Sequence, residues 1–441
     1  MAEQLLSVGL DIGTTSTQMV LSELTVENRA SAFSVPEIQI SRRRILYRSP
    51  IHFTPLLQGE LVDGAAIRAI VTEEYRSAGI TREQVDTGAV IITGETSRKE
   101  NAATVLQNLS DFAGDFVVAT AGPDLESLLA AQGAGAVSYS ADTGRSVIHM
   151  DIGGGTSNLA CIVDGVITAT GCWNVGGRLL KFDATGAITY RSPVLTDLFP
   201  CQVGEIPTAA QLDALADTLV SALEMAAGLR PPDALLTRLQ TAGAASWPDA
   251  PAGAVISFSG GVADCIATAH PDLAFGDMGP ALGRTIRRSR LCRGEYRLGA
   301  ETIRATVIGA GNHATQLSGS TVFYQNITFP LKNLPVVAGI AQLSALDTAG
   351  ILHLTDAPAT YAQITRLADQ IAATWPAQPV LIAMESDIAK ALGHALALRF
   401  PKDRPILCID RVRLADNSYL DIAAPRSGAL PIVIKTLILS R

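Results

Sequence analysis

The sequence predicts an α/β fold in which two similar lobes close around a ligand cleft. The first observation is a duplication, because an apolar strand followed by Asp-Ile-Gly and a threonine-bearing turn occurs at Asp11 and again at Asp151. The second is the alternation of apolar, strand-length runs with helical patterns. The third is composition: 48% of the residues are apolar and 17% are charged, against roughly 25% charged in ordinary domains, which provides ample surface to bury.

The first half of the chain begins with a strand, a tight turn and a second strand. Residues 7–10 are apolar and run into the first Asp-Ile-Gly, and residues 18–21 resume the apolar character. Residues 63–78 carry apolar side chains on one helical face, which predicts an amphipathic helix. Further elements are expected as strands over 89–92 and 116–119 and helices over 101–109 and 125–131.

The second half repeats the opening and then continues. An apolar strand over 146–150 precedes the second Asp-Ile-Gly, and a strand over 159–163 leads into the hairpin signal Asp164-Gly165. Later elements are expected as a long helix over 209–227, a strand over 255–258, strands over 379–382, 405–409 and 432–439, and a helix over 388–398. We therefore expect a first lobe over 1–145, a second over 146–320, and a segment over 321–441 that completes a lobe or docks a partner.

Charge and cysteine usage exclude several classes of function. The net charge is −8 and no basic stripe is interleaved with aromatic residues, so we expect no nucleic-acid partner. The one dense basic run, at residues 42–44 and 48, is interpreted as a solvated strand edge or loop, with docking onto an acidic partner as the alternative. No apolar run of about 18 residues predicts a membrane helix. The six cysteines form no Cys-x-x-Cys pair, which is typical of reduced thiols in the cytoplasm.

The first Asp-Ile-Gly turn has the chemistry of a phosphate loop. Gly13 lets the backbone turn sharply and approach a ligand closely. The N–H groups of residues 13–15 and the hydroxyls of Thr14, Thr15 and Ser16 can then donate to phosphate oxygens. Asp11 is left to hold Mg²⁺ through its water shell, since Mg²⁺ gives up water reluctantly.

The second turn offers the same groups with more room. Asp151 is followed by Gly153, Gly154, Gly155 and Thr156. Two such loops facing each other can clamp a polyphosphate from both sides, and catalysis of phosphoryl transfer is largely positioning and charge stabilisation. One such turn alone is an ordinary hairpin signal, but two copies, each after an apolar strand, favour the clamp.

These two turns resemble phosphate motifs 1 and 2 of the superfamily of actin, heat-shock chaperones and sugar kinases. The resemblance implies a two-lobed actin-like ATPase fold, with duplicated ribonuclease H-like lobes around a nucleotide cleft, and ATP with Mg²⁺ as cofactors. Residues 94–101, which include Glu95, are similar to the first connecting segment. Residues 256–263 resemble the adenosine motif and residues 305–311 the second connecting segment, so Gly260 and Gly261, or Gly309 and Gly311, would serve the adenosine.

The group that activates water is expected between the first connecting segment and phosphate motif 2. Glu126 is the first candidate and Asp124 the second, in a stretch similar to an exopolyphosphatase element. The alternative is that both are carboxylates facing the dipole at the start of a helix. Glu95 either orients water or metal or is a solvated loop carboxylate. His149 is expected to be a satisfied core histidine, and Arg178 either reaches phosphate or fixes a loop.

The whole chain resembles the family of reactivating factors of ethanolamine ammonia-lyase. Residues 8–18, 92–101, 149–158, 259–264 and 309–319 carry that resemblance. It implies an ATPase that releases damaged cobalamin from the lyase, its protein partner, in the cytoplasm and in association with the ethanolamine microcompartment. An exopolyphosphatase or sugar-kinase-like phosphotransferase of the same fold, or an actin-like assembly protein, remains as an alternative, and the sequence leaves a homo-oligomer open.

Overall fold

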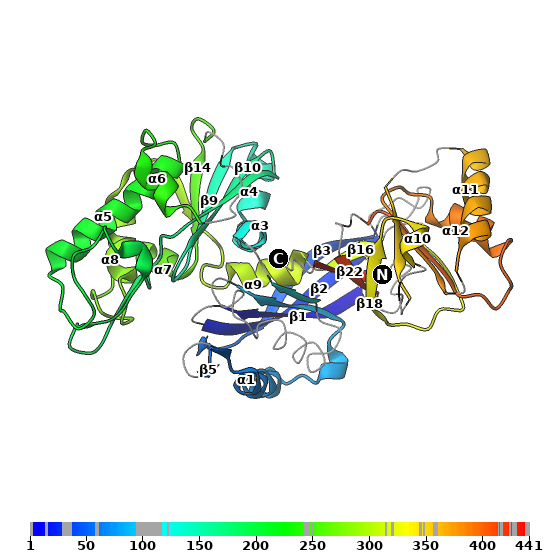
Figure 1. The fold of residues 1–441 in the computed structure, drawn as a ribbon, viewed down its shortest axis with the longest axis horizontal. Coiled ribbons are helices and arrows are strands. Elements are labelled where there is room, and N and C mark those ends of the chain that lie inside the picture. Colours follow the sequence, from blue (N-terminus) through cyan, green and yellow to red (C-terminus); the bar gives the residue numbers. More distant parts are fainter. Residues whose placement is uncertain are drawn as a thin grey trace.

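The described residues fold around three large β-sheets, with two further two-stranded sheets (Figure 1). The computed structural model describes residues 3–13, 16–28, 38–57, 61–93, 117–120, 123–241, 247, 250–313, 315–318, 322–343, 346, 349–355, 360–376, 378–412, 414, 418–422, 425 and 430–436. We call the described residues 3–120 lobe 1, residues 147–298 lobe 2, and residues 315–436 the C-terminal module. Within these ranges no helix combines the length and apolarity needed to cross a bilayer.

The sheet of lobe 1 has the strand order β3-β2-β1-β7-β8. The first three strands are antiparallel to one another, and β1, β7 and β8 run parallel. The long hairpin arises because the Asp-Ile-Gly turn reverses the chain directly after β1. The strands are β1 (Glu3–Ile12), β2 (Ser16–Asn28), β3 (Ile38–Arg48), β7 (Thr87–Ile92) and β8 (Val117–Thr120).

The sheet of lobe 2 repeats this plan with the order β11-β10-β9-β14-β15. Its first three strands are again antiparallel, and β9, β14 and β15 again run parallel. The duplication predicted from the two Asp-Ile-Gly turns is therefore a duplication of the whole sheet. The strands are β9 (Val147–Ile152), β10 (Ser157–Val163), β11 (Val166–Trp173), β14 (Val255–Ser259) and β15 (Tyr296–Leu298).

Local sequence signals account for the helix boundaries. The side chain of Asp63 caps α1 (Gly64–Ser77), and Thr208 with Gln211 forms a capping box at α5 (Ala209–Ala226). Both helices were predicted, whereas the helix expected over 101–109 lies outside the described residues. Other helices are α4 (Ala136–Thr143), α6 (Ala234–Leu239), α7 (Gly261–Ala267) and α8 (Gly279–Arg288), with short 3₁₀ turns η1 (Arg82–Gln84), η3 (Pro193–Leu195) and η4 (Arg290–Cys292).

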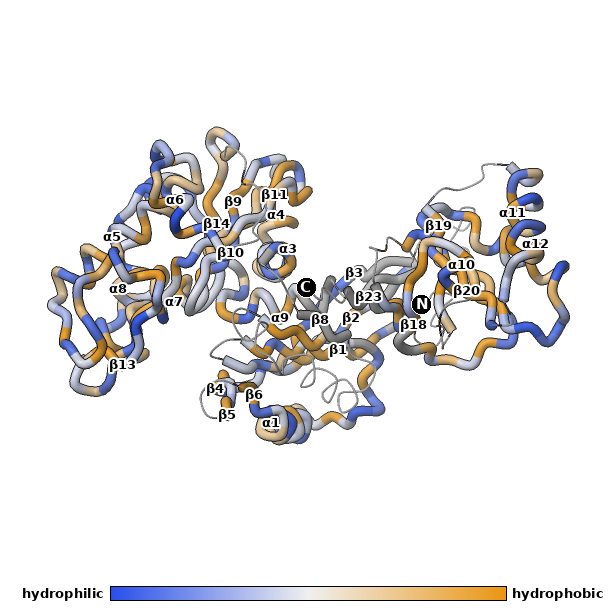
Figure 2. Tube along the Cα trace, in the orientation of Figure 1, coloured by the Kyte–Doolittle hydropathy of each residue, from blue (hydrophilic) through white to orange (hydrophobic). Residues whose placement is uncertain are grey.

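Burial follows the strands. All six residues of β9 are buried, and this strand, labelled in Figure 2, is the middle strand of the lobe 2 sheet. At the opposite extreme, β3 forms the edge of its sheet and exposes Arg42, Arg43 and Arg44, as a solvated strand edge should. Short strand pairs complete the lobes: β4 (His52–Phe53), β5 (Leu56–Leu57), β6 (Leu61–Val62), β12 (Leu180–Phe182) and β13 (Ile188–Arg191).

Two helices cross between the lobes. α3 (Pro123–Gly133) follows the sheet of lobe 1 but packs on β9, β10 and β11 of lobe 2. α9 (Ala305–His313) follows the sheet of lobe 2 but packs on β1, β2 and β7 of lobe 1. The two helices also pack against each other, and glycines make their close approach possible. A Cβ on Gly133 would lie 1.8 Å from the carbonyl oxygen of Ala305, and one on Gly309 would lie 1.9 Å from that of Leu129.

The C-terminal module holds an eight-stranded mixed sheet of order β16-β23-β22-β18-β19-β20-β21-β17. Its centre, β18 to β21, is parallel, and β23 and β16 contact β8 and β3 of lobe 1. The strands are β16 (Thr315–Ser318), β17 (Phe323–Gln325), β18 (Leu331–Val337), β19 (Ile351–Leu354), β20 (Val380–Met384), β21 (Ile406–Ile409), β22 (Ser418–Ile422) and β23 (Leu430–Thr436), with helices α10 (Ile340–Leu343), α11 (Tyr361–Thr374) and α12 (Ala389–Ala397).

Candidate functional site

The two Asp-Ile-Gly turns adopt the same hairpin. In each, the N–H of the glycine donates to the carbonyl oxygen three residues later, from Gly13 to Ser16 and from Gly153 to Thr156, both at 2.9 Å. The Gly13 N–H, predicted as a phosphate donor, is thus engaged inside its own hairpin. In lobe 2 the N–H groups of Gly154 and Gly155 make no backbone hydrogen bond among the described residues, and both glycines line the cavity described next, so these groups can donate to a ligand.

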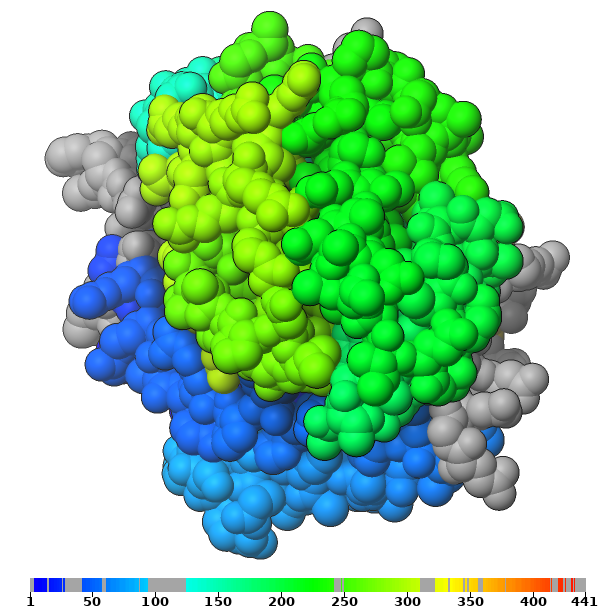
Figure 3. Space-filling model, turned by 90° about the vertical axis from the view of Figure 1, so that its left-hand side faces the viewer, coloured from blue at the N-terminus to red at the C-terminus, as the bar shows by residue number. Residues whose placement is uncertain are grey.

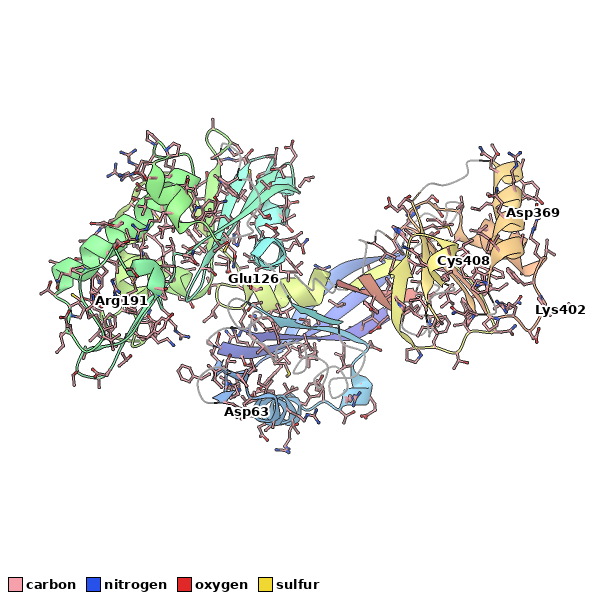
Figure 4. The ribbon with its side chains drawn as sticks, in the orientation of Figure 1. Asp63, Glu126, Arg191, Asp369, Lys402 and Cys408 are labelled. Carbon is pink, nitrogen blue, oxygen red and sulfur yellow. The ribbon has the colours of Figure 1, made fainter. Side chains whose placement is uncertain are left out.

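A cavity of about 360 Å³ lies where the two hairpins face each other. Figure 3 shows lobe 2 resting over lobe 1 on this side of the molecule, and Figure 4 places Glu126 at the junction of the lobes. The predicted residues that line the cavity are Asp11, Gly13, Ser16, Glu126, Asp151, Gly153, Gly154, Gly155, Thr156, Gly260 and Gly261. Thr14, Thr15 and Glu95 lie outside the described residues.

Asp11 stands buried at the end of β1. Its Oδ1 accepts a hydrogen bond of 2.9 Å from the hydroxyl of Thr93, which follows the parallel strand β7. Burial raises the pKa of Asp11 to about 7; the Thr93 hydrogen bond lowers it, and the nearby charge of Asp151 raises it. The two carboxylates are therefore close enough to sense each other across the cleft.

Asp151 has the equivalent position in lobe 2. Ser259, its partner in the parallel strand β14, donates to Oδ1 at 2.5 Å. Thr306 on α9 approaches Oδ2 at 3.5 Å. Burial raises the pKa of Asp151 to about 6, and the hydrogen bonds from Ser259 and Thr306 lower it.

The pair of carboxylates fits a hydrated magnesium ion. Two buried carboxylates without a cation are costly to keep charged, and a cation between them removes that cost. Mg²⁺ commonly keeps several waters and uses one or two protein carboxylates together with substrate phosphates. Among the described residues no cluster of three or more His, Cys, Asp and Glu side chains suits a metal.

His149 is the satisfied core histidine that the sequence predicted. Its side chain is fully buried between two serines, with Nδ1 at 3.1 Å from the Ser257 hydroxyl and Nε2 at 2.9 Å from the Ser259 hydroxyl. Burial lowers the pKa of His149 to about 3, so the ring is neutral at physiological pH.

Arg178 both fixes the second hairpin and faces the cavity. Its backbone N–H donates to the Gly154 carbonyl at 2.6 Å, and the preceding Gly177 N–H donates to the Gly153 carbonyl at 3.0 Å. Its guanidinium lines the cavity and donates through Nε to Asp277 at 3.1 Å. Burial raises the pKa of Asp277, while the Gly279 N–H and Arg178 lower it.

The two candidate bases on α3 differ in their surroundings. Glu126 is buried, lines the cavity and accepts a hydrogen bond of 2.6 Å from the Asn158 amide. Asp124 is exposed and accepts from the Thr170 hydroxyl at 2.6 Å. Since Asp124 is absent from the cavity lining, Glu126 is the carboxylate that geometry favours.

The two glycine-rich runs lie in different parts of the structure. Gly260, with φ of 84°, and Gly261 line the cavity at the start of α7, and a Cβ on Gly260 would lie 2.3 Å from the Ile152 carbonyl oxygen. Gly309 instead faces α3 at the helix crossing, and Gly311 lies in the same helix. Gly260 and Gly261 therefore border the cavity, while Gly309 is required by helix packing.

Sequence reasoning missed the residues that orient the carboxylates. Thr93, Ser259 and Thr306 hold Asp11 and Asp151, and all three line or border the cleft from other elements. A usable signal was present, because a hydroxyl residue ends or follows each strand that runs parallel to an Asp-Ile-Gly strand. Thr306 carried no such signal, since its position depends on α9 crossing between the lobes.

Two lobes of identical strand order, joined by crossing helices and facing each other with paired carboxylate hairpins, define an actin-like ATPase fold. Among solved structures, an exopolyphosphatase from Cytophaga hutchinsonii matches 69% of this chain and 96% of its own, with a TM-score of 0.39 and 11% identity.

The family model for ethanolamine utilisation protein EutA matches residues 3–353 and 345–440. Ethanolamine ammonia-lyase reactivase EutA of Salmonella typhimurium strain LT2 is 38% identical, and that of Escherichia coli K12 is 37% identical, each over 98% of both chains. The chain belongs to the EutA family.

Proposed function

We propose that this protein is an ATP-dependent reactivase of ethanolamine ammonia-lyase. It binds ATP with Mg²⁺ between the two hairpins and uses binding and hydrolysis to move the lobes. That motion releases damaged cobalamin from the lyase so that intact adenosylcobalamin can rebind. The observation that carries the proposal is the cavity with facing Asp11 and Asp151 in a chain that matches two curated reactivases along almost its whole length.

Both hairpins supply a metal-binding carboxylate and phosphate donors in the proposed site. Asp11 and Asp151 would hold the hydrated Mg²⁺, which neutralises charge on the phosphate oxygens. The N–H groups of Gly154 and Gly155 and the hydroxyls of Ser16 and Thr156 would donate to those oxygens. Charge-assisted hydrogen bonds contribute roughly 1.5–3 kcal/mol each, so a few such donors give useful affinity.

Glu126 is proposed to accept the proton of the attacking water. It lies in the cavity, and Asn158 fixes one of its oxygens. A positioned general base contributes typically 10²–10⁴-fold to a rate. The adenosine would lie against Gly260 and Gly261, which line the cavity at the start of α7.

The lobes and the C-terminal segment would have separate roles in the proposed function. The lobes over 1–145 and 146–320 would grip the nucleotide, and the segment over 321–441, which contacts lobe 1 through β23, would dock the lyase. Its location would be the cytoplasm, in association with the ethanolamine microcompartment.

The test is a reactivation assay. Lyase inactivated with cyanocobalamin is incubated with the protein, Mg-ATP and fresh adenosylcobalamin, and deamination of ethanolamine is followed. We expect recovery with ATP and none without it. Asp11→Asn or Asp151→Asn should abolish ATP turnover and recovery while the far-ultraviolet circular dichroism spectrum stays unchanged.

Two outcomes would contradict the proposal. Unchanged turnover in both variants would refute the metal role of the carboxylates. No recovery by the wild-type protein, together with robust cleavage of polyphosphate, would assign it instead to the phosphotransferases of the same fold.

A further inference from the structure

A buried chain of hydrogen bonds leads away from the lobe 2 carboxylate. It runs from Asp151 to Ser259, then to His149, then to Ser257. The parallel register of β9 and β14 creates it, because His149 lies opposite Ser257 and Asp151 opposite Ser259. Residues two apart on a strand point to the same face, so the four side chains form one row. Each of the four is at most 9% exposed.

The directions of these hydrogen bonds follow from the number of protons. An ionised carboxylate only accepts, so the single hydroxyl proton of Ser259 is donated to Asp151. Ser259 must then accept from His149, which requires the proton of the neutral ring to sit on Nε2. Nδ1 is left with a lone pair, and the Ser257 hydroxyl donates to it. One tautomer of His149 thus fixes the whole row.

The fold itself does not require an imidazole at this position. In lobe 1 the residue two places before the Asp-Ile-Gly aspartate is Gly9. α9 packs directly on it, since a Cβ there would lie 2.7 Å from the Val307 carbonyl oxygen. Asp11 accordingly has Thr93 as its donor and no histidine behind it. The duplicated lobes therefore differ here in chemistry while sharing their strand order.

We propose that His149 is a positioning residue that acts on the metal carboxylate through Ser259. Because the Nε2–H of His149 donates to the Ser259 oxygen, the Ser259 hydroxyl directs its own proton toward Oδ1 of Asp151. Oδ1 thereby accepts the short hydrogen bond of 2.5 Å, and Oδ2, approached by Thr306 only at 3.5 Å, is the less engaged oxygen and would be the one to hold a hydrated Mg²⁺. This inference rests on the proposed function, because it assigns a partner to the proposed Mg-ATP site.

A pair of amide variants separates positioning from packing. Gln at position 149 can place its N–H₂ near the original Nε2 and keep the donor to Ser259. Asn is shorter, reaches only the region of Nδ1 and loses that donor. ADP affinity is measured by isothermal titration calorimetry with and without Mg²⁺, beside thermal unfolding and the Mg²⁺ activation of ATP turnover.

We expect His149→Asn to lower the Mg²⁺-dependent part of ADP affinity by about two- to tenfold, the effect of one lost hydrogen bond between neutral groups. His149→Gln should rescue most of it, and Mg²⁺-free ADP binding should be the same in both variants. Equal losses in both variants, or none in His149→Asn, would overturn the inference.

The tautomer provides a second measurement that does not depend on a folded variant. ¹⁵N NMR of histidine-labelled wild-type protein should show His149 protonated at Nε2, and protonation at Nδ1 would overturn the proposal. Asp151→Asn distinguishes a failure of the His149 inference from a failure of the proposed function. If it abolishes Mg²⁺-dependent binding while His149→Asn does not, only this inference fails. If the wild-type protein shows no Mg²⁺-dependent binding, the proposed function fails with it.

Discussion

The crossing of α3 and α9 permits a sharp test of how the lobes are joined. At this crossing two backbones meet without a side chain between them. In Gly133→Ala the new Cβ would lie 1.8 Å from the Ala305 carbonyl oxygen and 2.8 Å from the Gly309 nitrogen. Real Cβ atoms essentially never approach closer than 3.0 Å. Relief at Ala305 therefore requires a displacement of about 1.2 Å, the difference between 3.0 and 1.8 Å.

That displacement must come from helix backbone, because neither contacting atom belongs to a flexible side chain. Overpacking of this kind costs typically 1–3 kcal/mol. α3 covers the sheet of lobe 2 and α9 that of lobe 1, so separating the helices also shifts the two hairpins relative to each other. We expect Gly133→Ala to lower the free energy of unfolding by about 1–3 kcal/mol and to weaken Mg-ADP binding.

The assay is urea unfolding followed by tryptophan fluorescence, together with calorimetric titration of Mg-ADP. Gly294→Ala is the matched control, because a Cβ at Gly294 meets nothing within 4 Å, and its effect should stay within about 0.5 kcal/mol. If Gly133→Ala is as harmless as this control in both measurements, the helices do not touch through their backbones in solution.

Three further predictions concern the cleft. Burial raises the pKa of Asp11 to about 7 from the ordinary 3.8, so between these values the folded apo protein holds a proton that the unfolded chain has released; its stability should fall as the pH rises through this window. The thermal midpoint of the wild-type protein should therefore decrease from about pH 5 to about pH 8, and that of Asp11→Asn should decrease less steeply. Equal slopes in the two proteins would refute the assignment of this pKa to Asp11. Glu126→Gln should lower the turnover number by about 100-fold or more while ADP affinity is retained, and joint loss of both would indicate a structural role. Arg178→Ala should weaken ATP by about tenfold relative to adenosine if the guanidinium reaches phosphate, as calorimetry with the two ligands will show.

Much of the lining of the cavity between the lobes could be predicted because its groups are local in sequence. Each hairpin lies within one short segment, so Asp11, Gly13, Asp151 and Gly153 followed from the duplicated motif alone. The long helices α1 and α5 followed from apolar periodicity and from caps at Asp63 and Thr208. Such features depend on neighbours within a few residues, which a single sequence displays directly.

The side chains that orient the two carboxylates, in contrast, are placed by strand register and by the crossing of α3 and α9. Ser259 donates to Asp151 only because β14 runs parallel to β9 in one particular register. His149 could be predicted as buried but not as the donor behind Ser259, since that role requires knowing which strand lies beside it. Gly309 belonged to one of the two glycine-rich runs that were alternatives for the adenosine site, and the structure places it against Leu129 of α3.

The crossing also explains how a nucleotide could move the lobes. Thr306 belongs to α9, which packs on lobe 1, yet its hydroxyl reaches Asp151 in lobe 2 at 3.5 Å. Glu126 belongs to α3, which packs on lobe 2 although the chain enters it from lobe 1. Each hairpin lies within its own lobe, so we expect the long contact between Thr306 and Asp151 to shorten or break if the lobes rotate about the helix crossing. A ligand that bridges the hairpins interacts with both lobes at once, and its differential affinity for the closed arrangement supplies the free energy for closure.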